Sequence, residues 1–215
     1  MGRDGFAEGQ AAYQASVPEF GTRPLLFRRT SVEEFEGLLA ACDRGERFEW
    51  VRGWVVQQQA GGTRRHSDLS ARVYGLLLGQ LDQAQWKTRY EFAVFTGESY
   101  RYADIIVEPA DQDAAGLRTE QPALVVEIVS RSSWERDRIT KAQEYTTLPS
   151  LHAYLVVDQF SRSCLGFLRR PDGGFDADPR LFTDGETIRI DPLGVGLSID
   201  DIYDGILDRD DDAIA

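Results

Sequence analysis

Two acidic residues interrupt segments of the sequence that otherwise have the composition of buried β-strands. Asp104 lies in the segment 102–108, and Glu127 lies in the segment 124–130. A lone ionised carboxylate is costly to bury, so each of these side chains needs a cationic partner. Carboxylates on neighbouring strands can converge on one hard divalent cation, and Mg²⁺ accepts one or two carboxylates beside waters and phosphate oxygens. The pattern therefore favours a metal site suited to phosphodiester hydrolysis.

A structural role is the alternative for both acids. Arg101 or Arg131 could neutralise them as ion-pair partners, or each carboxylate could point out of the end of its strand. For a single acid this alternative is the more common case. Two acids on neighbouring strands shift the balance towards a shared cation.

Lysine usage adds a third candidate. The chain has two lysines, Lys87 and Lys141, beside 22 arginines. A lysine is a compact donor that can orient a nucleophilic water or stabilise a developing oxyanion, which makes Lys141 informative. The alternative is an exposed i,i+4 ion pair between Lys141 and Asp137 on a helix. The spacing alone does not separate the two roles.

His66 and Glu49 are further candidates for the same site. His66 follows Arg64 and Arg65 just before a predicted helix, and together with Arg72 these arginines favour an anion at the helix entrance. A lone histidine is more often a cap or a surface residue than a catalyst. Glu49 lies in an aromatic-rich segment, where pairing with a nearby arginine is its alternative role.

The first elements that position these residues are a helix, a hairpin and a second helix. The tetrapeptide Thr30-Ser31-Val32-Glu33 fits a capping box, which predicts a helix that ends near residues 42–46. Gly53 predicts a tight hairpin within residues 47–59. Apolar residues then recur at helical spacing from Ser67 to Leu81.

The rest of the chain indicates an α/β core with a mixed β-sheet flanked by helices. Strands are expected over 102–108, 124–130 and 153–158, and a helix is expected over 134–147. Further strands, most of them peripheral, are expected at residues 90–97, 164–170, around 175 and at 186–190.

The charge is unevenly distributed along the chain. A formal charge of −12 at first argues against a nucleic-acid partner, because phosphate contacts normally come from an excess of Lys and Arg. However, residues 191–215 hold eight acids and one base, so −7 of that charge lies near the C-terminus. We expect a flexible segment at 1–24, one domain at 25–205 and an acidic tail at 206–215.

The cysteines and the hydropathy predict a cytoplasmic protein. Cys42 and Cys164 are far apart and form no CxxC motif, so reduced thiols are expected. No N-terminal apolar stretch resembles a signal peptide, and no run approaches the ~18 apolar residues that span a bilayer. No membrane partner is expected.

Five segments carry a resemblance to a known family: ERFEWVRGWVV, RRHSDLSARVYGLLLGQL, YRYADIIV, PALVVEIVSRSSWERDRITKAQEY and HAYLVVD. In this order they resemble the blocks of the Uma-type restriction endonuclease family, which belongs to the PD-(D/E)xK nuclease superfamily. The resemblance covers about residues 26–203, and its most specific part runs from Glu127 to Tyr145. It implies a restriction-endonuclease-like core and a divalent-metal-dependent endonuclease that acts on DNA.

The resemblance implies roles for individual residues of this chain. Asp104 and Glu127 would ligate Mg²⁺ or Mn²⁺, with the peptide carbonyl of Ile128 as a third protein ligand. The superfamily lysine usually stands two residues after the glutamate, where this chain has Val129. In this family that lysine is displaced onto the following helix, and Lys141 occupies its place.

The resemblance also extends to residues around the metal. Glu49 and His66 match the acid of the family's first block and the histidine before its long helix, and they would support the metal or the phosphate. Ala103 stands where a proline commonly precedes the aspartate in this family. This difference removes no side-chain group that takes part in the chemistry. Five arginines could contact DNA backbone phosphates: Arg64, Arg65, Arg131, Arg136 and Arg138.

Two other functions and one assembly state stay open. The chain could be a non-catalytic nuclease fold that binds nucleic acid or protein, or a hydrolase that uses the same constellation on a small phosphate ester. Nucleases of the superfamily are often homodimers, which lets two sites address two strands. No residue pattern identifies a base-reading element.

Overall fold

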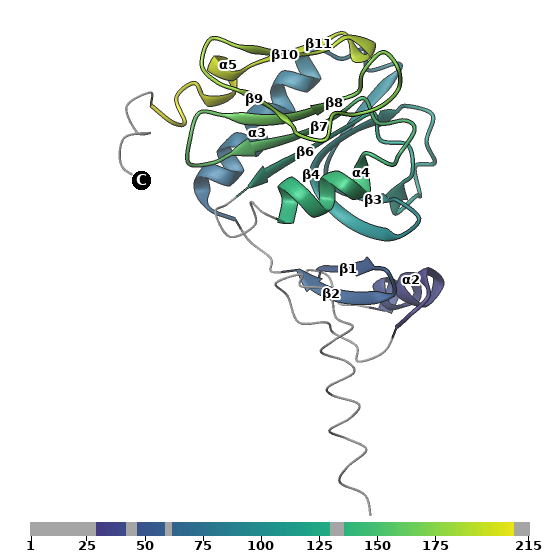
Figure 1. The fold of residues 1–215 in the computed structure, drawn as a ribbon. Coiled ribbons are helices and arrows are strands. Elements are labelled where there is room, and N and C mark those ends of the chain that lie inside the picture. Colours follow the sequence, from purple (N-terminus) through teal and green to yellow (C-terminus); the bar gives the residue numbers. More distant parts are fainter. Residues whose placement is uncertain (1–28, 42–46, 59–61, 130–135, 209–215) are drawn as a thin grey trace, which may run out of the picture. The chain divides into compact units, whose positions relative to one another are not determined.

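The computed structural model describes residues 29–41, 47–58, 62–129 and 136–208, and all statements below concern these residues. Compactness divides the chain into two units, Met1–Ala60 and Gly61–Ala215, and each is described by itself (Figure 1). The domain boundaries expected from the sequence stay a prediction. No helix of the described residues is long and apolar enough to cross a membrane.

The N-terminal unit contains the expected helix and hairpin. Helix α2 spans Val32–Ala41. Strands β1 (Arg47–Val51) and β2 (Trp54–Gln58) pair antiparallel around a two-residue turn. Both turn residues have positive φ, 47° at Arg52 and 91° at Gly53. Two consecutive positive φ values match the twist of the flanking strands, which explains the tight turn.

The capping box of α2 lies one residue later than the sequence pattern predicts. The Ser31 amide donates to the Glu34 carboxylate at 3.1 Å, and the Glu34 amide donates to the Ser31 hydroxyl at 3.2 Å. Thr30, the predicted cap, instead donates through its amide and its hydroxyl to the carbonyl of Gly53. The hairpin turn therefore engages Thr30, and the next hydroxyl caps the helix, so the prediction of Thr30 and Glu33 was wrong.

A mixed β-sheet forms the centre of the second unit and confirms the predicted α/β class. Its strands lie in the order β5–β3–β4–β6–β7–β8–β9. The pairs β6–β7 and β3–β5 are parallel, and the other pairs are antiparallel. The strands are β3 (Trp86–Phe95), β4 (Ser99–Pro109), β5 (Arg118–Thr119), β6 (Leu124–Val129), β7 (Ala153–Asp158), β8 (Cys164–Leu168) and β9 (Arg180–Phe182).

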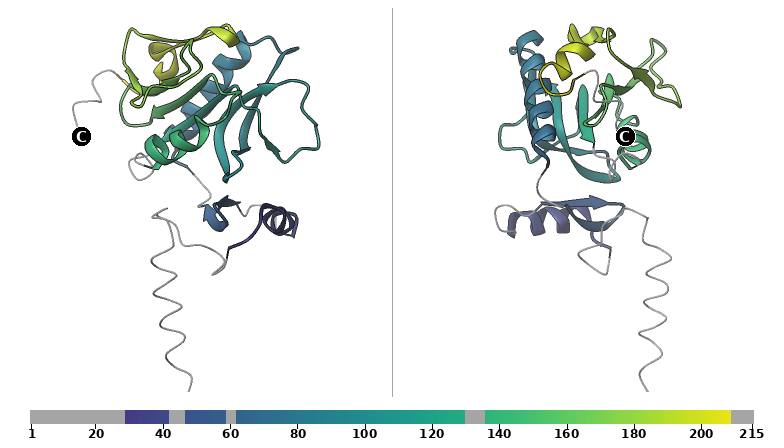
Figure 2. Two further views of the ribbon diagram at one scale, coloured as in Figure 1. Left: turned by 45° about the vertical axis from the view of Figure 1, so that its right-hand side comes forward. Right: turned by 90° about the vertical axis from the view of Figure 1, so that its left-hand side faces the viewer.

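Helices cover both faces of this sheet, as the right-hand view of Figure 2 shows. On one face, α3 (Arg64–Gln80) buries Leu69, Val73 and Leu77 against β4, β6 and β7. The same core includes α5 (Ile199–Tyr203) and the hairpin of β10 (Thr187–Ile190) and β11 (Val195–Ser198), whose strands are joined by the 3₁₀ turn Asp191–Leu193. On the other face, α4 (Ala142–Tyr145) packs Tyr145 against Tyr154 of β7.

Two helix boundaries differ from the sequence-based expectation. Helix α3 begins at Arg64 rather than Ser67, because the Thr63 hydroxyl accepts from the His66 amide at 3.1 Å and caps the helix. His66 therefore lies in the first turn of α3 and not before it. The described part of the predicted helix 134–147 consists of a π-helical segment, Arg136–Lys141, followed by the single turn of α4.

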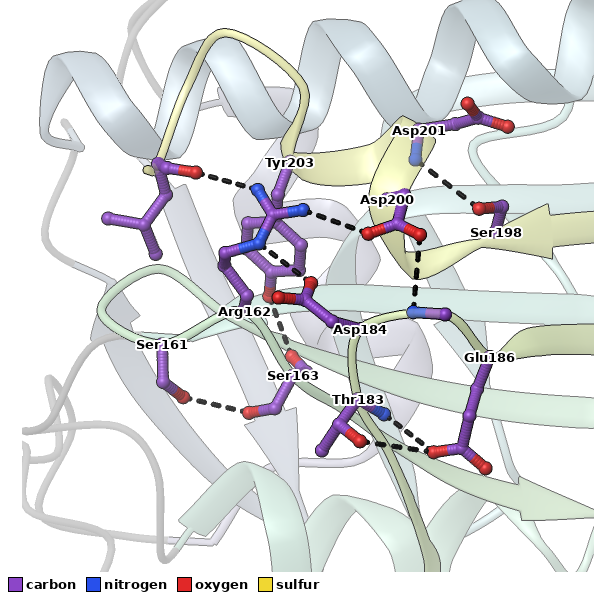
Figure 3. A network of polar contacts seen from close by, with 12 residues as sticks. Ser161, Arg162, Ser163, Thr183, Asp184, Glu186, Ser198, Asp200, Asp201 and Tyr203 are labelled. Atoms are coloured by element: carbon purple, nitrogen blue, oxygen red, sulfur yellow. Dashed lines mark hydrogen bonds and ion pairs between the residues drawn. The ribbon is translucent and has the colours of Figure 1, made fainter. Parts of the chain in front are cut away.

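A polar network fastens α5 to the sheet (Figure 3). The buried guanidinium of Arg162 donates to Asp184 at 2.7 Å, to Asp200 at 3.2 Å and to the carbonyl of Leu207 at 2.6 Å. It also lies 5.6 Å from the ring centroid of Tyr203. Asp200, one of the eight acids of residues 191–215, thus has a structural role.

Candidate active site

The candidate site lies at the carboxyl ends of the parallel strands β6 and β7, the edge at which α/β sheets usually bind ligands. Next to them, β4 and β6 are paired from Val107↔Leu124 to Ile105↔Val126. Asp104 and Glu127 are the next residues beyond that last pair. The strand register therefore brings the two predicted metal ligands to adjacent positions where the ladder ends.

Where the ladder ends, the Asp104 carboxylate accepts a hydrogen bond from a backbone amide of β6. Its Oδ2 accepts from the amide of Ile128 at 2.7 Å. One peptide unit thus connects the two acids, since Ile128 directly follows Glu127. In a strand, the N–H and C=O of one residue face the same neighbour, so the carbonyl of Ile128 also faces the side of β4. The third predicted ligand is therefore on the side of Asp104.

The Glu127 side chain lies against the helix on the other face of the sheet. Lys141 Nζ donates to Glu127 Oε1 at 2.8 Å, and the Tyr145 hydroxyl lies 3.4 Å from the same oxygen. The side chains of Lys141 and Glu127 are 4% and 6% exposed. Lys141 is therefore a buried partner of Glu127, and its alternative role in an exposed helical ion pair was wrong.

His66 contacts Asp104 from the first turn of α3. Its Nε2 lies 3.3 Å from Asp104 Oδ2. The hydrogen bond to Asp104 raises the pKa of His66 above its ordinary value, although burial opposes the rise, and the charges of Asp104 and Glu91 add to it. The structure thus brings Asp104, Glu127, Lys141 and His66 into one chain of contacts through the amide of Ile128.

Glu91 is an acidic neighbour that sequence reasoning missed. On β3 it lies between the pairs Tyr90↔Ile105 and Phe92↔Ala103, which places it opposite Asp104. Its φ of 49° is in the left-handed region that non-glycine residues rarely adopt, and such strain often occurs at functional sites. A glutamate in an alternating strand gives no such signal in the sequence. Among the described residues, no three His, Cys, Asp or Glu side chains form a group that could hold a metal.

Gln159 is a second residue that sequence reasoning missed. Directly after β7, its side-chain oxygen accepts from the Thr63 hydroxyl at 2.6 Å, and its backbone oxygen accepts from Arg65 at 3.1 Å. The backbone amide of Gln159 donates to the backbone carbonyl of Val129 at 3.3 Å. This 2% exposed residue thereby ties the first turn of α3, which carries His66, to the ends of β6 and β7.

The structure describes only part of the predicted basic surface. Arg64 is exposed in the first turn of α3, and Arg65 is engaged with Gln159. Arg72 donates to the backbone oxygens of Asp201 and Asp204, and its contribution to a local anion site stays a prediction. Arg131 and the side chains of Arg136 and Arg138 lie outside the described residues.

Arg101 and Glu49 are two further residues that the sequence analysis considered. Arg101, considered as a partner for the buried acids, makes a bidentate ion pair with Glu144 on α4. Glu49 lies on β1 opposite Val56, in the N-terminal unit that is described by itself. Its predicted role near the metal stays a prediction.

Comparisons with known proteins agree with this fold. The sequence model of the Uma2 family, described as "Putative restriction endonuclease", matches residues 32–201. Two uncharacterized proteins of Synechocystis sp. are similar to the chain. One is 29% identical over 121 residues, which cover 54% of this chain and 68% of that protein. The other is 26% identical over 171 residues, which cover 75% and 85%.

A solved structure has the same fold. The crystal structure of a "putative nuclease belonging to DUF820" from Anabaena variabilis ATCC 29413 superposes with a TM-score of 0.63. The match covers 83% of this chain and 99% of that one at 13% sequence identity. At this identity the similarity establishes the nuclease-like fold alone.

Proposed function

The chain belongs to the Uma2 family, "Putative restriction endonuclease", and from this premise we propose that it is a divalent-metal-dependent endonuclease that hydrolyses DNA phosphodiester bonds. One observation carries the proposal. Asp104 and Glu127 occupy adjacent positions where the β4–β6 ladder ends, the Ile128 amide donates to Asp104, and a buried lysine contacts Glu127 at 2.8 Å.

The donor atoms at this site fit a hard cation. Two carboxylates and a peptide carbonyl are oxygen ligands of the kind that Mg²⁺ and Mn²⁺ prefer. Mg²⁺ usually takes one or two carboxylates and fills its other positions with water and substrate phosphate, so a third acidic ligand is not required. Asp104, Glu127 and the carbonyl of Ile128 would hold the ion, which supplies Lewis-acid activation of the phosphoryl group and of a bound water.

Lys141 acts on the reacting oxygens in this proposal. Its buried ammonium group lies 2.8 Å from Glu127 Oε1, one of the proposed metal-binding oxygens. It donates to the attacking water or to a non-bridging oxygen of the pentacovalent transition state, where negative charge develops. The water oxygen bonds to phosphorus as the bond from phosphorus to one backbone ester oxygen breaks; the water releases a proton to solvent, and the leaving oxygen takes one up.

His66 and the arginines serve the phosphate and the DNA backbone. The Asp104 carboxylate orients the His66 imidazole and favours its protonated form, which is attractive to a phosphate oxygen. Arg64 is exposed next to it at the amino end of α3, where backbone amides also favour anions. Arg131, Arg136 and Arg138 are proposed to add phosphate contacts, and Glu49 to support the metal. A homodimer would present two such sites to two strands.

Nicking of supercoiled plasmid tests this proposal. The purified chain is incubated with plasmid in EDTA, Mg²⁺ or Mn²⁺, and the relaxed and linear products are quantified. We expect cleavage with either metal and none in EDTA, with losses of at least about a hundredfold for Asp104→Asn, Glu127→Gln and Lys141→Met. Lys87→Met is the matched lysine control, because Lys87 Nζ donates to the carbonyl of Gln83 on the surface.

Two results would overturn the proposal. Wild-type protein that binds plasmid without cutting it under any metal would favour a non-catalytic nucleic-acid-binding nuclease fold. Equal cleavage by wild type and by Asp104→Asn would point to a contaminating nuclease.

A further inference from the structure

We propose that the buried ion pair between Arg101 and Glu144 is a positioning device that holds Lys141 at the active site. This inference rests on the proposed function for the role of Lys141. Arg101 lies on β4, three residues before Asp104, and Glu144 lies on α4, three residues after Lys141. The pair therefore connects the strand that carries one proposed metal ligand to the helical segment that carries the lysine.

The geometry of this pair is rigid. Arg101 Nε donates to Glu144 Oε2 at 2.8 Å, and a terminal guanidinium nitrogen of Arg101 donates to Oε1 at 2.8 Å. The two side chains are 1% and 7% exposed. A bidentate guanidinium–carboxylate contact fixes orientation as well as distance, and water competes little with it at this burial.

The spacing of three residues places the anchor and the lysine on one face of the helix. Lys141, Glu144 and Tyr145 stand at i, i+3 and i+4, positions that face the same side. Lys141 and Tyr145 contact Glu127 on β6, whereas Glu144 contacts Arg101 on β4. This helical face is thus held by two neighbouring strands, through residues that both lie beyond the last pair of their ladder.

The helical segment itself cannot orient Lys141. Helix α4 has four residues and directly follows a π-helical segment of six. The ten described residues of this continuous segment are too few for a helix that is stable alone, and π-helical turns are rare in proteins. A buried ion pair adds little net stability compared with apolar residues of similar size, so fixing the orientation is the better explanation for its presence.

The reactivity of the two lysines tests the proposal without using nuclease activity. The folded full-length protein is treated with an amine-acetylating reagent, and acetylation at each lysine is followed by mass spectrometry. Lys141 is 3% exposed and Lys87 is partly exposed, so Lys87 serves as an internal reference. We expect Glu144→Gln to raise the acetylation rate of Lys141 about tenfold relative to Lys87.

A paired variant separates positioning from simple loss of stability. Arg101→Met combined with Glu144→Leu removes both charges and leaves no buried ion unpaired, so the chain should fold. We expect it to show raised Lys141 acetylation and, on plasmid, a reduced kcat with an unchanged KM. Glu108→Gln is the control, because Glu108 pairs with Arg89 near the other end of β4; it should leave Lys141 protected.

The outcomes distinguish this inference from the proposed function. A folded paired variant with wild-type Lys141 protection and wild-type kcat overturns the positioning role and leaves the nuclease assignment standing. Raised acetylation in variants of a chain that never cuts DNA supports the positioning of Lys141 and overturns the nuclease assignment.

Discussion

Replacing Lys141 with methionine should destabilise the metal-free protein strongly, because it removes the ammonium group that lies 2.8 Å from the buried Glu127 carboxylate. The side chains of the pair are 4% and 6% exposed, and their charged atoms are 2.8 Å apart. Removing one partner from a buried pair typically reduces the free energy of unfolding by about 3–5 kcal/mol. For a chain of this size, that loss corresponds to a fall of roughly 6–20 °C in Tm.

The assay is urea-induced unfolding in EDTA, followed by tryptophan fluorescence and by circular dichroism. Lys87→Met is the matched control, since its donor reaches a surface carbonyl, and it should change the free energy of unfolding by less than about 0.5 kcal/mol. The double variant Lys141→Met with Glu127→Gln should recover a large part of the loss, because no buried carboxylate is left uncompensated.

The reasoning fails if Lys141→Met and Lys87→Met are equally stable. It also fails if adding Glu127→Gln to Lys141→Met destabilises the chain further, because the uncompensated carboxylate would then not be the origin of the loss.

Three further predictions concern groups around the sheet. In metal-free protein, NMR titration should give a midpoint above 6.5 for His66 and below 6.5 for His152, whose pKa burial and the charge of Arg169 lower. Because the pKa of His66 is raised, its contribution to stability is full below about pH 6.5 and is lost as the pH rises through its folded-state value; coincident midpoints would contradict this assignment. Burial raises the pKa of Cys164 to about 12, so with the other cysteine replaced by serine the native chain should not react with a disulfide reagent at pH 8 until it is unfolded by urea. Arg162→Met should lower the free energy of unfolding by about 1–3 kcal/mol and speed amide exchange in α5, whereas replacing a surface-exposed arginine with methionine should do neither.

The sheet could be predicted because its strands are apolar runs that admit few other structures. Strands form at all three predicted segments, 102–108, 124–130 and 153–158. The observed limits differ from the predicted ones by at most three residues. The two interrupting acids were identifiable for the same reason, since a carboxylate in an apolar run is conspicuous. Their adjacent positions follow from the pairing of β4 with β6.

Features that depend on tertiary contacts could not be predicted. The capping box moved from Thr30 to Ser31 because the hairpin turn, more than twenty residues away, engages Thr30. Nothing in the sequence around Glu144 indicates a buried ion pair, because its partner Arg101 lies 43 residues earlier in the chain.

The local backbone geometry around the site could not be predicted from the sequence either. The positive φ of Glu91 arises where β3 passes Asp104, and no residue preference signals it. The π-helical segment before α4 has the sequence of a normal helix, and it carries Lys141 into contact with Glu127 only in the folded sheet.

The most direct test of whether Asp104 and Glu127 hold a divalent cation is a titration of Mn²⁺ into the metal-free protein. Binding is followed by calorimetry or by the electron paramagnetic resonance signal of free Mn²⁺. We predict one site in the wild type, a loss of at least about tenfold in affinity for Asp104→Asn and for Glu127→Gln, and wild-type binding for Asp68→Asn, an exposed acid on α3. Equal Mn²⁺ affinity in the wild type and all three variants would contradict the account.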